Sequence, residues 1–395
     1  MRLLHTSDWH LGRTLHGLDL IEEQAQALAH IVEVARAEQV DAVLVCGDVY
    51  DRAVPPVEAV RVFERSVAAL AAFTHVVISS GNHDSAIRLG ALSALLTERV
   101  HIRTHVDLVG QPVVLGDEHG EVLVYPVPYL DPEATRHVLG GGEPLERRHA
   151  AVLGAALDRV RADLATRAAG PGAPPRSVVM AHAFVAGRGG EAQVSESERD
   201  LRVGGEELVP TDVFAGITYT ALGHLHGPQE PRAQGPGVIR YSGSPLRYSF
   251  SEAGHVKSVT LVELDAEGVA GVRLVPVPQP REMAQVRGAL ASLVADPAHA
   301  AAEACWVRAV VTDDVRPNGM FDALRGRFPH LLTAHHVPQR TGTITVAPAD
   351  GQGDPLDVLA RFLADAAGVE DPIGEHLELL RAHYEQQQRE EEGVA

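Results

Sequence analysis

Acidic, amide and imidazole side chains stand in short clusters along this sequence, each directly after a short apolar segment. The segment 40–46 (VDAVLVC) is the clearest of these, and Gly47 and Asp48 follow it at once. A strand buried on both faces of a sheet has this composition, and open α/β folds bind ligands where such strands end. We therefore expect the clustered side chains to meet at one edge of a sheet: Asp8, His10, Asp48, Asn82, His83, Asp84, His182, His224 and His226.

Carboxylate oxygens, amide oxygens and imidazole nitrogens gathered at one edge would bind divalent cations of hard or borderline character. The clusters lack cysteine, which excludes a structural zinc site built on thiolates. The possible ligands are too many for one ion but suit two ions that share a carboxylate, and Asp48 is the natural bridge. Two ions about 3.5–4 Å apart form a clamp used in phosphoester hydrolysis. Each cluster alone would fit an ordinary turn, and His182 alone a core histidine, but their order, each closing a strand, favours the metal site.

These side chains can meet only if the strands before them end at the same edge of a sheet. Alternating strand and helix patterns along the chain predict such a sheet. Apolar segments predict strands at 1–7, 40–46 and 75–79, and apolar residues with helical spacing predict helices over 19–38 and after Pro55-Pro56. This order predicts parallel strands joined by right-handed crossovers. The later patterns predict strands at 122–127, 177–181 and 217–222, a helix at about 147–168, and closing antiparallel strands at 238–242, 256–264 and 269–275.

The proline-rich segment 276–280 (PVPQP) predicts a domain boundary. Beyond it the patterns predict a small α+β domain with helix 282–295, strand 306–311, helix 320–328 and strand 331–337. The predicted organisation is therefore a main domain over 1–278, a small α+β domain over 281–347 and a pair of helices over 354–390.

The composition limits the partners of the chain. Its 395 residues carry a net charge of −19, which argues against a large exposed surface for nucleic acid. Lys257 is the only lysine and lies outside any G-x-x-x-x-G-K-[ST] motif, so ATP dependence would have to come from another chain.

The distant Cys46 and Cys305 predict two buried thiols in a reducing compartment. The sequence shows no long apolar run and no export signal, which predicts a cytoplasmic protein without a membrane segment.

The clusters carry a family resemblance. Asp-x-His, Gly-Asp-x-x-Asp, Gly-Asn-His-Asp, a lone histidine and Gly-His-x-His resemble the motif series of the calcineurin-like metallophosphoesterases. More narrowly, the chain resembles the SbcD-type family of bacterial nuclease subunits through the segments 5–17 (HTSDWHLGRTLHG), 195–205 (SESERDLRVGG), 221–229 (ALGHLHGPQ) and 241–252 (YSGSPLRYSFSE). The resemblance implies an α/β fold: a metallophosphoesterase sandwich of mixed sheets flanked by helices, then a small α+β capping domain and C-terminal helices.

The resemblance also implies roles for single residues. One ion would be held by Asp8, His10, Asp48 and His226, and the other by Asp48, Asn82, His182 and His224. His83 would be the general acid that protonates the departing sugar oxygen, with Asp84 orienting its imidazole. The ordinary pKa of histidine lies near neutral, which suits that role. Relatives from archaea and eukaryotes carry a second histidine where this chain has Asp51, so the role of Asp51 stays open. The resemblance favours two Mn²⁺ ions, whereas the ligand types alone also admit iron or zinc.

The function implied by the resemblance is that of a DNA nuclease subunit of an ATP-driven repair complex, a 3′→5′ exonuclease on duplex ends and an endonuclease on single strands and hairpins. The implied partners are DNA and an SbcC-type coiled-coil ATPase. A homodimer within a heterotetramer would pair through Phe63, Leu89, Leu92, Leu95 and Leu96. The helices over 354–390 would dock the ATPase, or else pack on their own domain. Two other functions remain open: a phosphodiesterase or phosphatase acting on small molecules, which would not need the added domain, and a non-catalytic scaffold, which would not need the complete ligand set.

Overall fold

The structure is a computed structural model that describes residues 1–96, 98–169, 175–187, 193–198, 208–233, 235–339, 378–379 and 381–384. The chain divides into two compact units. The first comprises Met1–Thr312 and Pro317–Val337, and the second comprises Asp313–Arg316 and Pro338–Ala395. Most of the predicted helix pair over 354–390 lies outside the described residues, and its few described residues are helical.

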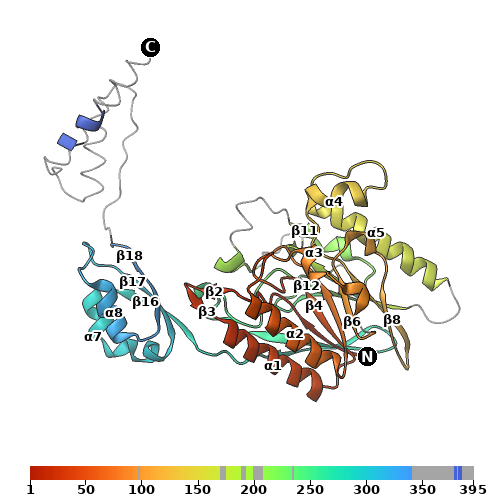
Figure 1. Cartoon of the computed structure of the whole chain (residues 1–395), viewed down its shortest axis with the longest axis horizontal. Helices are drawn as coiled ribbons and strands as arrows, with labels where there is room; N and C mark the ends of the chain where they lie inside the picture. Colours follow the sequence, from red (N-terminus) through yellow and green to blue (C-terminus); the bar gives the residue numbers. More distant parts are fainter. Residues whose placement is uncertain are drawn as a thin grey trace, which may run out of the picture. The chain divides into compact units, whose positions relative to one another are not determined.

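A six-stranded sheet forms one half of a two-sheet sandwich in the first unit, in the order β15-β14-β1-β4-β5-β6. Figure 1 labels its strands β4 and β6 and the helices α1 and α2. The strands β1, β4, β5 and β6 run parallel, as the alternation of strands and helices predicts, and β14 and β15 are antiparallel. Helices α1 and α2 pack on the outer face of this sheet through their buried apolar residues. The bounds are β1 Arg2–Thr6, β4 Ala42–Cys46, β5 His75–Ser79, β6 Val100–Arg103, β14 Ser258–Leu264, β15 Val269–Pro276, α1 Ile21–Ala37 and α2 Val57–Ala71.

A five-stranded sheet forms the other half, in the order β13-β12-β9-β8-β7. Helix α5 covers its outer face through the buried residues Val152, Leu153, Ala156 and Val160. The prediction of antiparallel pairing for 238–242 is wrong, because β13 pairs parallel with β12 through Tyr219–Val238 and the following residues. The bounds are β7 Val113–Asp117, β8 Gly120–Pro126, β9 Arg176–His182, β12 Tyr219–Gly223, β13 Val238–Tyr241, α4 Pro132–Leu139 and α5 His149–Ala168.

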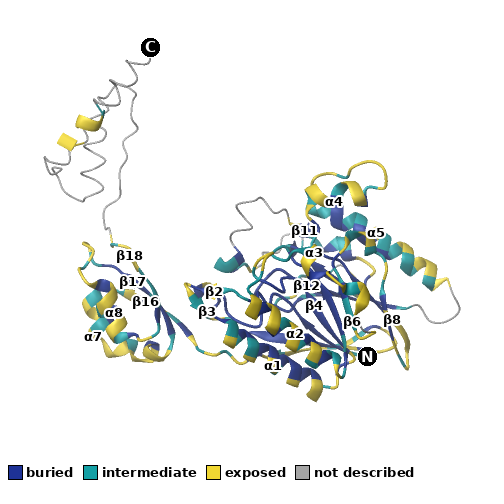
Figure 2. Cartoon of the chain, viewed as in Figure 1, coloured by how far each residue is buried: buried dark blue, intermediate teal, exposed yellow. Residues whose placement is uncertain are grey.

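The inner faces of the two sheets pack on each other and form the central core. Leu44 and Cys46 of β4 lie in one apolar cluster with Met180 of β9 and Tyr219 of β12. Figure 2 shows the strands buried in the interior and the helices exposed on their outward sides. The two-sheet sandwich flanked by helices, expected from the resemblance, is therefore the observed fold.

The segment after the sandwich holds a three-stranded parallel sheet in the order β16-β17-β18. A separate apolar cluster that includes Val307, Leu324 and Phe328 forms its core. The prediction of one helix over 282–295 is wrong, because β16 pairs along its whole length with β17 and the helix begins only at Leu290. The bounds are β16 Met283–Gly288, α7 Leu290–Ala295, β17 Trp306–Val311, α8 Met320–Arg327 and β18 Leu331–His336.

Several short elements complete the described fold. They are β2 Thr14–Leu15, β3 Leu18–Asp19, β10 Val185–Ala186, β11 Val209–Pro210, α3 Ala86–Leu89 and the 3₁₀ helices Ser93–Leu95, Val106–Leu108, Glu196–Glu198, Thr211–Phe214, Phe250–Glu252 and Pro297–Ala304. Of the two thiols, Cys46 is buried as predicted, whereas Cys305 is partly exposed. Among the residues that the structure describes, no helix is both long enough and apolar enough to span a membrane.

Candidate metal centre

The predicted site residues lie where the strands of both sheets end. Asp8 and Asp48 follow β1 and β4 of the first sheet, whereas His182 ends β9 and His224 follows β12 of the second sheet. The two sheets approach closely at this edge because glycine separates β4 from Asp48. Gly47 has a φ of +81°, and a Cβ placed on it would lie only 2.3 Å from Nδ1 of His182. A side chain at position 47 would therefore collide with a site residue.

The backbone of the site is strained at four of the predicted ligands. Asp8, His10, Asp48 and His224 have φ angles of +53°, +44°, +47° and +106°. Non-glycine residues seldom adopt positive φ, and such strain persists only where the surrounding structure enforces it. Its concentration at these four positions marks the strand ends as a functional site.

One group of ligand atoms converges between β1 and the loop after β12. Nε2 of His10 lies 3.1 Å from Nε2 of His226 and 3.5 Å from Oδ2 of Asp48. The carboxylate of Asp8 lies with His10 and His226 in one set of potential ligand atoms that are all within 4.8 Å of one another. All four residues are buried.

A second group converges on the other side of Asp48. Nε2 of His182 lies 3.3 Å from Oδ2 of Asp48 and 3.0 Å from Oδ1 of Asn82. Nδ1 of His224 lies 3.3 Å from the same Asn82 oxygen. The oxygen Oδ2 of Asp48 thus stands between an imidazole of the first group, His10, and an imidazole of the second, His182.

The hydrogen-bonding pattern of His182 tests whether these residues suit a cation. Its Nδ1 lies 3.0 Å from the backbone carbonyl oxygen of Cys46, and a carbonyl can only accept, so Nδ1 carries the proton. Nε2 faces two oxygens, from Asp48 and Asn82, that also accept, so the arrangement requires positive charge at Nε2, either a second ring proton or a cation between Nε2 and these oxygens. Donor atoms bound to one divalent cation by bonds of about 2.1 Å lie about 3 Å apart. The residues present therefore fit a divalent metal site.

The pKa values of the site residues also favour a bound cation. Burial lowers the pKa of His10 to about 4 and that of His226 to about 3, so both rings are neutral near pH 7. Burial would also lower the pKa of His182, but the Asp48 carboxylate outweighs it and raises this pKa to about 10. Burial would raise the pKa of Asp48, but His182 and the other imidazoles hold it well below its usual range. The space between Asp48 and His182 therefore favours positive charge.

His83 lies beside the first group, with its ring centroid 4.8 Å from that of His10. The prediction that Asp84 orients this imidazole is wrong. The carboxylate of Asp84 accepts hydrogen bonds from the backbone N–H groups of Val49, Tyr50 and Gly81. Asp84 thus ties the loop after β4 to the loop after β5.

The carbonyl oxygen of Asp51 takes the place predicted for Asp84. It lies 2.8 Å from Nδ1 of His83, while a side-chain oxygen of Asp51 lies 3.3 Å from Nδ1 of His10. Asp51, whose role the sequence left open, therefore faces both imidazoles.

The prediction missed a set of polar residues that surround His226. Ser197, Glu198, Glu252 and Lys257 hydrogen-bond to His226 or to one another. They lie in or just after the segments 195–205 and 241–252, whose family resemblance is visible in the sequence. The family resemblance could have drawn attention to these residues, but only the fold shows that they surround His226.

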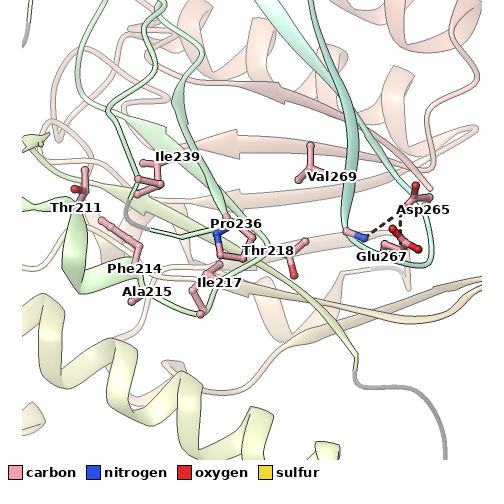
Figure 3. A pocket seen from close by; sticks show the side chains of 14 residues that line it. Thr211, Phe214, Ala215, Ile217, Thr218, Pro236, Ile239, Asp265, Glu267 and Val269 are labelled. Atoms are coloured by element: carbon pink, nitrogen blue, oxygen red, sulfur yellow. Dashed lines mark hydrogen bonds between the residues drawn. The ribbon is translucent and has the colours of Figure 1, made fainter.

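A cavity of about 360 Å³ lies elsewhere in the described structure, and no predicted site residue lines it (Figure 3). Its lining includes Thr218, directly before β12, whereas His224 directly follows β12. The cavity is therefore at the opposite end of that strand from the candidate metal centre.

Comparison with known proteins agrees with the motifs and the fold. The family model "Calcineurin-like phosphoesterase" matches residues 1–228. The D subunit of the nuclease SbcCD from Rhodobacter capsulatus is 39% identical over 300 residues, which are 72% of this chain and 71% of that protein. The protein of the same name from Bacillus subtilis is 36% identical over 275 residues, 67% of this chain and 66% of that protein.

Among solved structures, TT1561 of Thermus thermophilus is similar over 70% of this chain and 99% of its own, at 16% identity. The TM-score of 0.41 is too low to argue a shared fold. The family match, in contrast, covers more than half of the chain and includes every strand end that carries a predicted ligand. The prediction from the motifs is confirmed: the chain belongs to the calcineurin-like phosphoesterase family.

Proposed function

We propose that this chain is a two-metal-dependent DNA nuclease subunit. The observation that carries the proposal is the position of Asp48, whose Oδ2 lies 3.5 Å from Nε2 of His10 and 3.3 Å from Nε2 of His182. One carboxylate between two sets of ligand atoms suits two ions about 3.5–4 Å apart, a spacing used by phosphatases and nucleases.

The proposed ligands of the first ion are Asp8, His10, Asp48 and His226. Those of the second ion are Asp48, Asn82, His182 and His224. We favour Mn²⁺, because carboxylate and amide oxygens mixed with imidazole nitrogens suit it and the family resemblance implies it. Divalent cations held there supply Lewis acidity, which neutralises charge on a phosphate and makes water a better nucleophile.

The proposed proton donor is His83. Its Nδ1 lies 2.8 Å from the carbonyl oxygen of Asp51, which fixes the ring and leaves Nε2 for exchange with a substrate. The backbone N–H of His83 also donates to Oδ1 of Asp48 at 2.9 Å. This hydrogen bond fixes the position of the proposed proton donor relative to the proposed bridging ligand. A phosphate bound at the ions would then have its departing oxygen near His83.

The choice of DNA as substrate rests on the two curated relatives, both named as part of a nuclease. The proposed reactions are 3′→5′ exonuclease cleavage of duplex ends and endonuclease cleavage of single strands and hairpins. A net charge of −19 does not favour tight binding of DNA by this chain alone. We therefore propose an SbcC-type coiled-coil ATPase as the partner that supplies DNA affinity and ATP dependence, docked through residues 354–390.

A homodimer of the sandwich domain is a further part of the proposal. Leu92 and Leu95 are 72% and 79% exposed, and Ile87 nearby is 78% exposed, which supports an apolar pairing surface. Leu89, which the sequence placed on this surface, is buried, and Phe63 packs against the core under α2. The surface is therefore smaller than the sequence predicted.

The proposed activity is tested by incubating the purified chain and Mn²⁺ with a labelled DNA hairpin and, separately, with bis(p-nitrophenyl) phosphate. We expect the hairpin to be cut, and EDTA or Asp48→Asn to abolish the cutting. Cleavage of the small diester without cleavage of DNA would instead support a small-molecule phosphodiesterase. The absence of both activities from a chain that binds Mn²⁺ would support a scaffold.

The proposed docking segment is tested by deleting residues 354–390 and measuring co-purification of the ATPase. The deletion should abolish co-purification and leave Mn²⁺-dependent cutting of short single strands unchanged. Recovery of the ATPase equal to that with the full chain would place the docking site elsewhere.

A further inference from the structure

His226 is held by hydrogen bonds at every polar atom except the one that faces the candidate metal centre. Its backbone N–H donates to Glu198, its backbone carbonyl accepts from Nζ of Lys257 at 2.8 Å, and its ring Nδ1 lies 2.8 Å from Oγ of Ser197. Only Nε2 is directed at His10 and the site. Two of these three contacts lead to one buried ion pair.

That ion pair joins Lys257 and Glu252. Both side chains are fully buried, and Nζ of Lys257 lies 2.6 Å from Oε2 of Glu252. A buried ion pair stabilises a fold no better than apolar residues of similar size, so stability alone does not explain it. Lys257 is also the only lysine of the chain, although arginine serves elsewhere for buried charge, as in the pair of Arg176 with Asp117.

The direction of the hydrogen bonds follows from the charge on Glu252. An ionised carboxylate only accepts, so Oγ of Ser197 donates its single proton to Oε1 of Glu252, at 2.6 Å. Ser197 must then accept from Nδ1 of His226, which places the ring proton on Nδ1. The lone pair of a neutral His226 is consequently on Nε2, the atom that faces the site.

We propose that Lys257, Glu252 and Ser197 form a positioning relay that fixes the tautomer of His226 for metal binding. Lys257 keeps Glu252 ionised, Glu252 sets the direction of the Ser197 hydroxyl, and Ser197 sets the ring proton of His226. Partners behind a metal-binding histidine orient the ring in this way, and their loss typically weakens metal binding by about 10- to 100-fold. The relay rests on the proposed function, because it assigns His226 to one of the two ions.

The test compares Glu252→Gln with wild type. A neutral amide can donate to Ser197, which frees the hydroxyl to donate to Nδ1 and shifts the ring proton to Nε2. In metal-free protein with ¹⁵N-labelled histidine, we expect the His226 signals, identified by their loss in His226→Gln, to change from the Nδ1–H form to a mixture. In a Mn²⁺ titration followed by electron paramagnetic resonance, we expect one of two binding steps to weaken about 10- to 100-fold.

Three further variants guard against misfolding, since Glu252→Gln leaves Lys257 buried without its counter-ion. Glu252→Gln combined with Lys257→Met removes both charges and should show the same tautomer shift. Ser197→Ala should weaken the same Mn²⁺ step, and Ser197→Thr, which restores a hydroxyl, should recover it.

Matched controls separate positioning from stability. Ser258→Ala changes a buried serine beside Lys257 whose Oγ has no hydrogen-bond partner among the described residues. Arg176→Met breaks an ion pair between the start of β9 and the end of β7, in which the arginine is buried and Asp117 partly buried, at the opposite end of β9 from His182. Neither should change the tautomer or either Mn²⁺ step.

An unchanged His226 tautomer in Glu252→Gln and in the double variant would overturn the relay. Equal weakening of both Mn²⁺ steps, matched by Arg176→Met, would overturn it as well. The tautomer measurement needs no metal, so it decides the relay even if wild type fails to bind two Mn²⁺, a result that would instead count against the proposed function.

Discussion

The ring Nδ1 of His83 lies 2.8 Å from the backbone carbonyl oxygen of Asp51. Because a carbonyl oxygen only accepts, Nδ1 keeps its proton and Nε2 is the ring atom left to exchange a proton with a substrate. The contact ties the proposed acid to the loop after β4, the same loop that contains Asp48. The geometry of the proposed acid and that of the metal ligands therefore depend on one segment.

His83→Gln should lower the rate of DNA cleavage by about 10²-fold or more, because a positioned general acid contributes that much. Mn²⁺ stoichiometry should stay at the wild-type value, since His83 is not a proposed ligand. Single-turnover kinetics and a metal titration measure the two effects. The control His75→Gln changes a histidine at the start of β5, at the other end of the strand, and should leave both unchanged.

Asp84→Asn should destabilise the fold, because one of the two oxygens that accept the N–H groups of Val49, Tyr50 and Gly81 becomes a donor. The expected loss in the free energy of unfolding is about 1–3 kcal/mol, measured by urea denaturation. The shape of the pH–rate profile of the remaining activity should not change. Unaltered stability with a shifted profile would restore Asp84 as the partner of His83.

Gly81→Ala should weaken Mn²⁺ binding at least about ten-fold, an order-of-magnitude expectation for displacing a shared ligand. A Cβ on residue 81 would lie 2.1 Å from Oδ1 of Asp48 and 2.3 Å from its backbone nitrogen, so Asp48 must move. Gly154→Ala in α5 is the control, because a Cβ there meets nothing within 4 Å. Wild-type affinity in Gly81→Ala would mean that the position of Asp48 is not critical.

His5 should make the fold sensitive to acid. Its ring bridges the two sheets, with Nδ1 2.9 Å from the hydroxyl of Tyr219 and Nε2 3.1 Å from the carbonyl oxygen of Leu222. Burial lowers its pKa from 6.5 to about 3. Between these values the unfolded chain binds a proton that the folded chain does not, so the contribution is complete above pH 6.5 and declines as the pH falls below it.

At pH 5 the loss from His5 should be about 2 kcal/mol, at 1.36 kcal/mol per pH unit. His5→Gln should remove this part of the pH dependence, as measured by urea denaturation in EDTA between pH 5 and pH 8. The slope is the readout, since the substitution also changes packing. A slope equal to that of wild type would contradict the assignment, and the exposed His137→Gln serves as the control.

Much of the fold could be predicted because its buried strands have distinctive apolar sequences. The residues 75–79 and 306–311 form β5 and β17 as predicted, and the alternation with helices identified the parallel core of the first sheet. The errors occurred where pairing with another strand decides the structure. Residues 283–288 fit a helical pattern locally, but a neighbour in β17 holds them as a strand.

The candidate site was predictable in its members but less so in its contacts. The position of Asp48 and His182 at the ends of strands was enough to predict that they lie close together, because the strands end at the same edge of the fold. It could not show that Asp84 bonds to backbone N–H groups, since this depends on how the loops after β4 and β5 fold. Nor could it connect Ser197 and Lys257 with His226, because these contacts span about 30 residues in chain order and form only in the folded state.

The proposal of two ions that share Asp48 is tested most directly by anomalous diffraction at the manganese edge, from crystals grown with Mn²⁺. We expect two peaks about 3.5–4 Å apart, one on each side of the Asp48 carboxylate, the first next to His10 and His226 and the second next to His182 and His224. A single peak, or two peaks that do not share Asp48, would contradict the proposed two-metal centre.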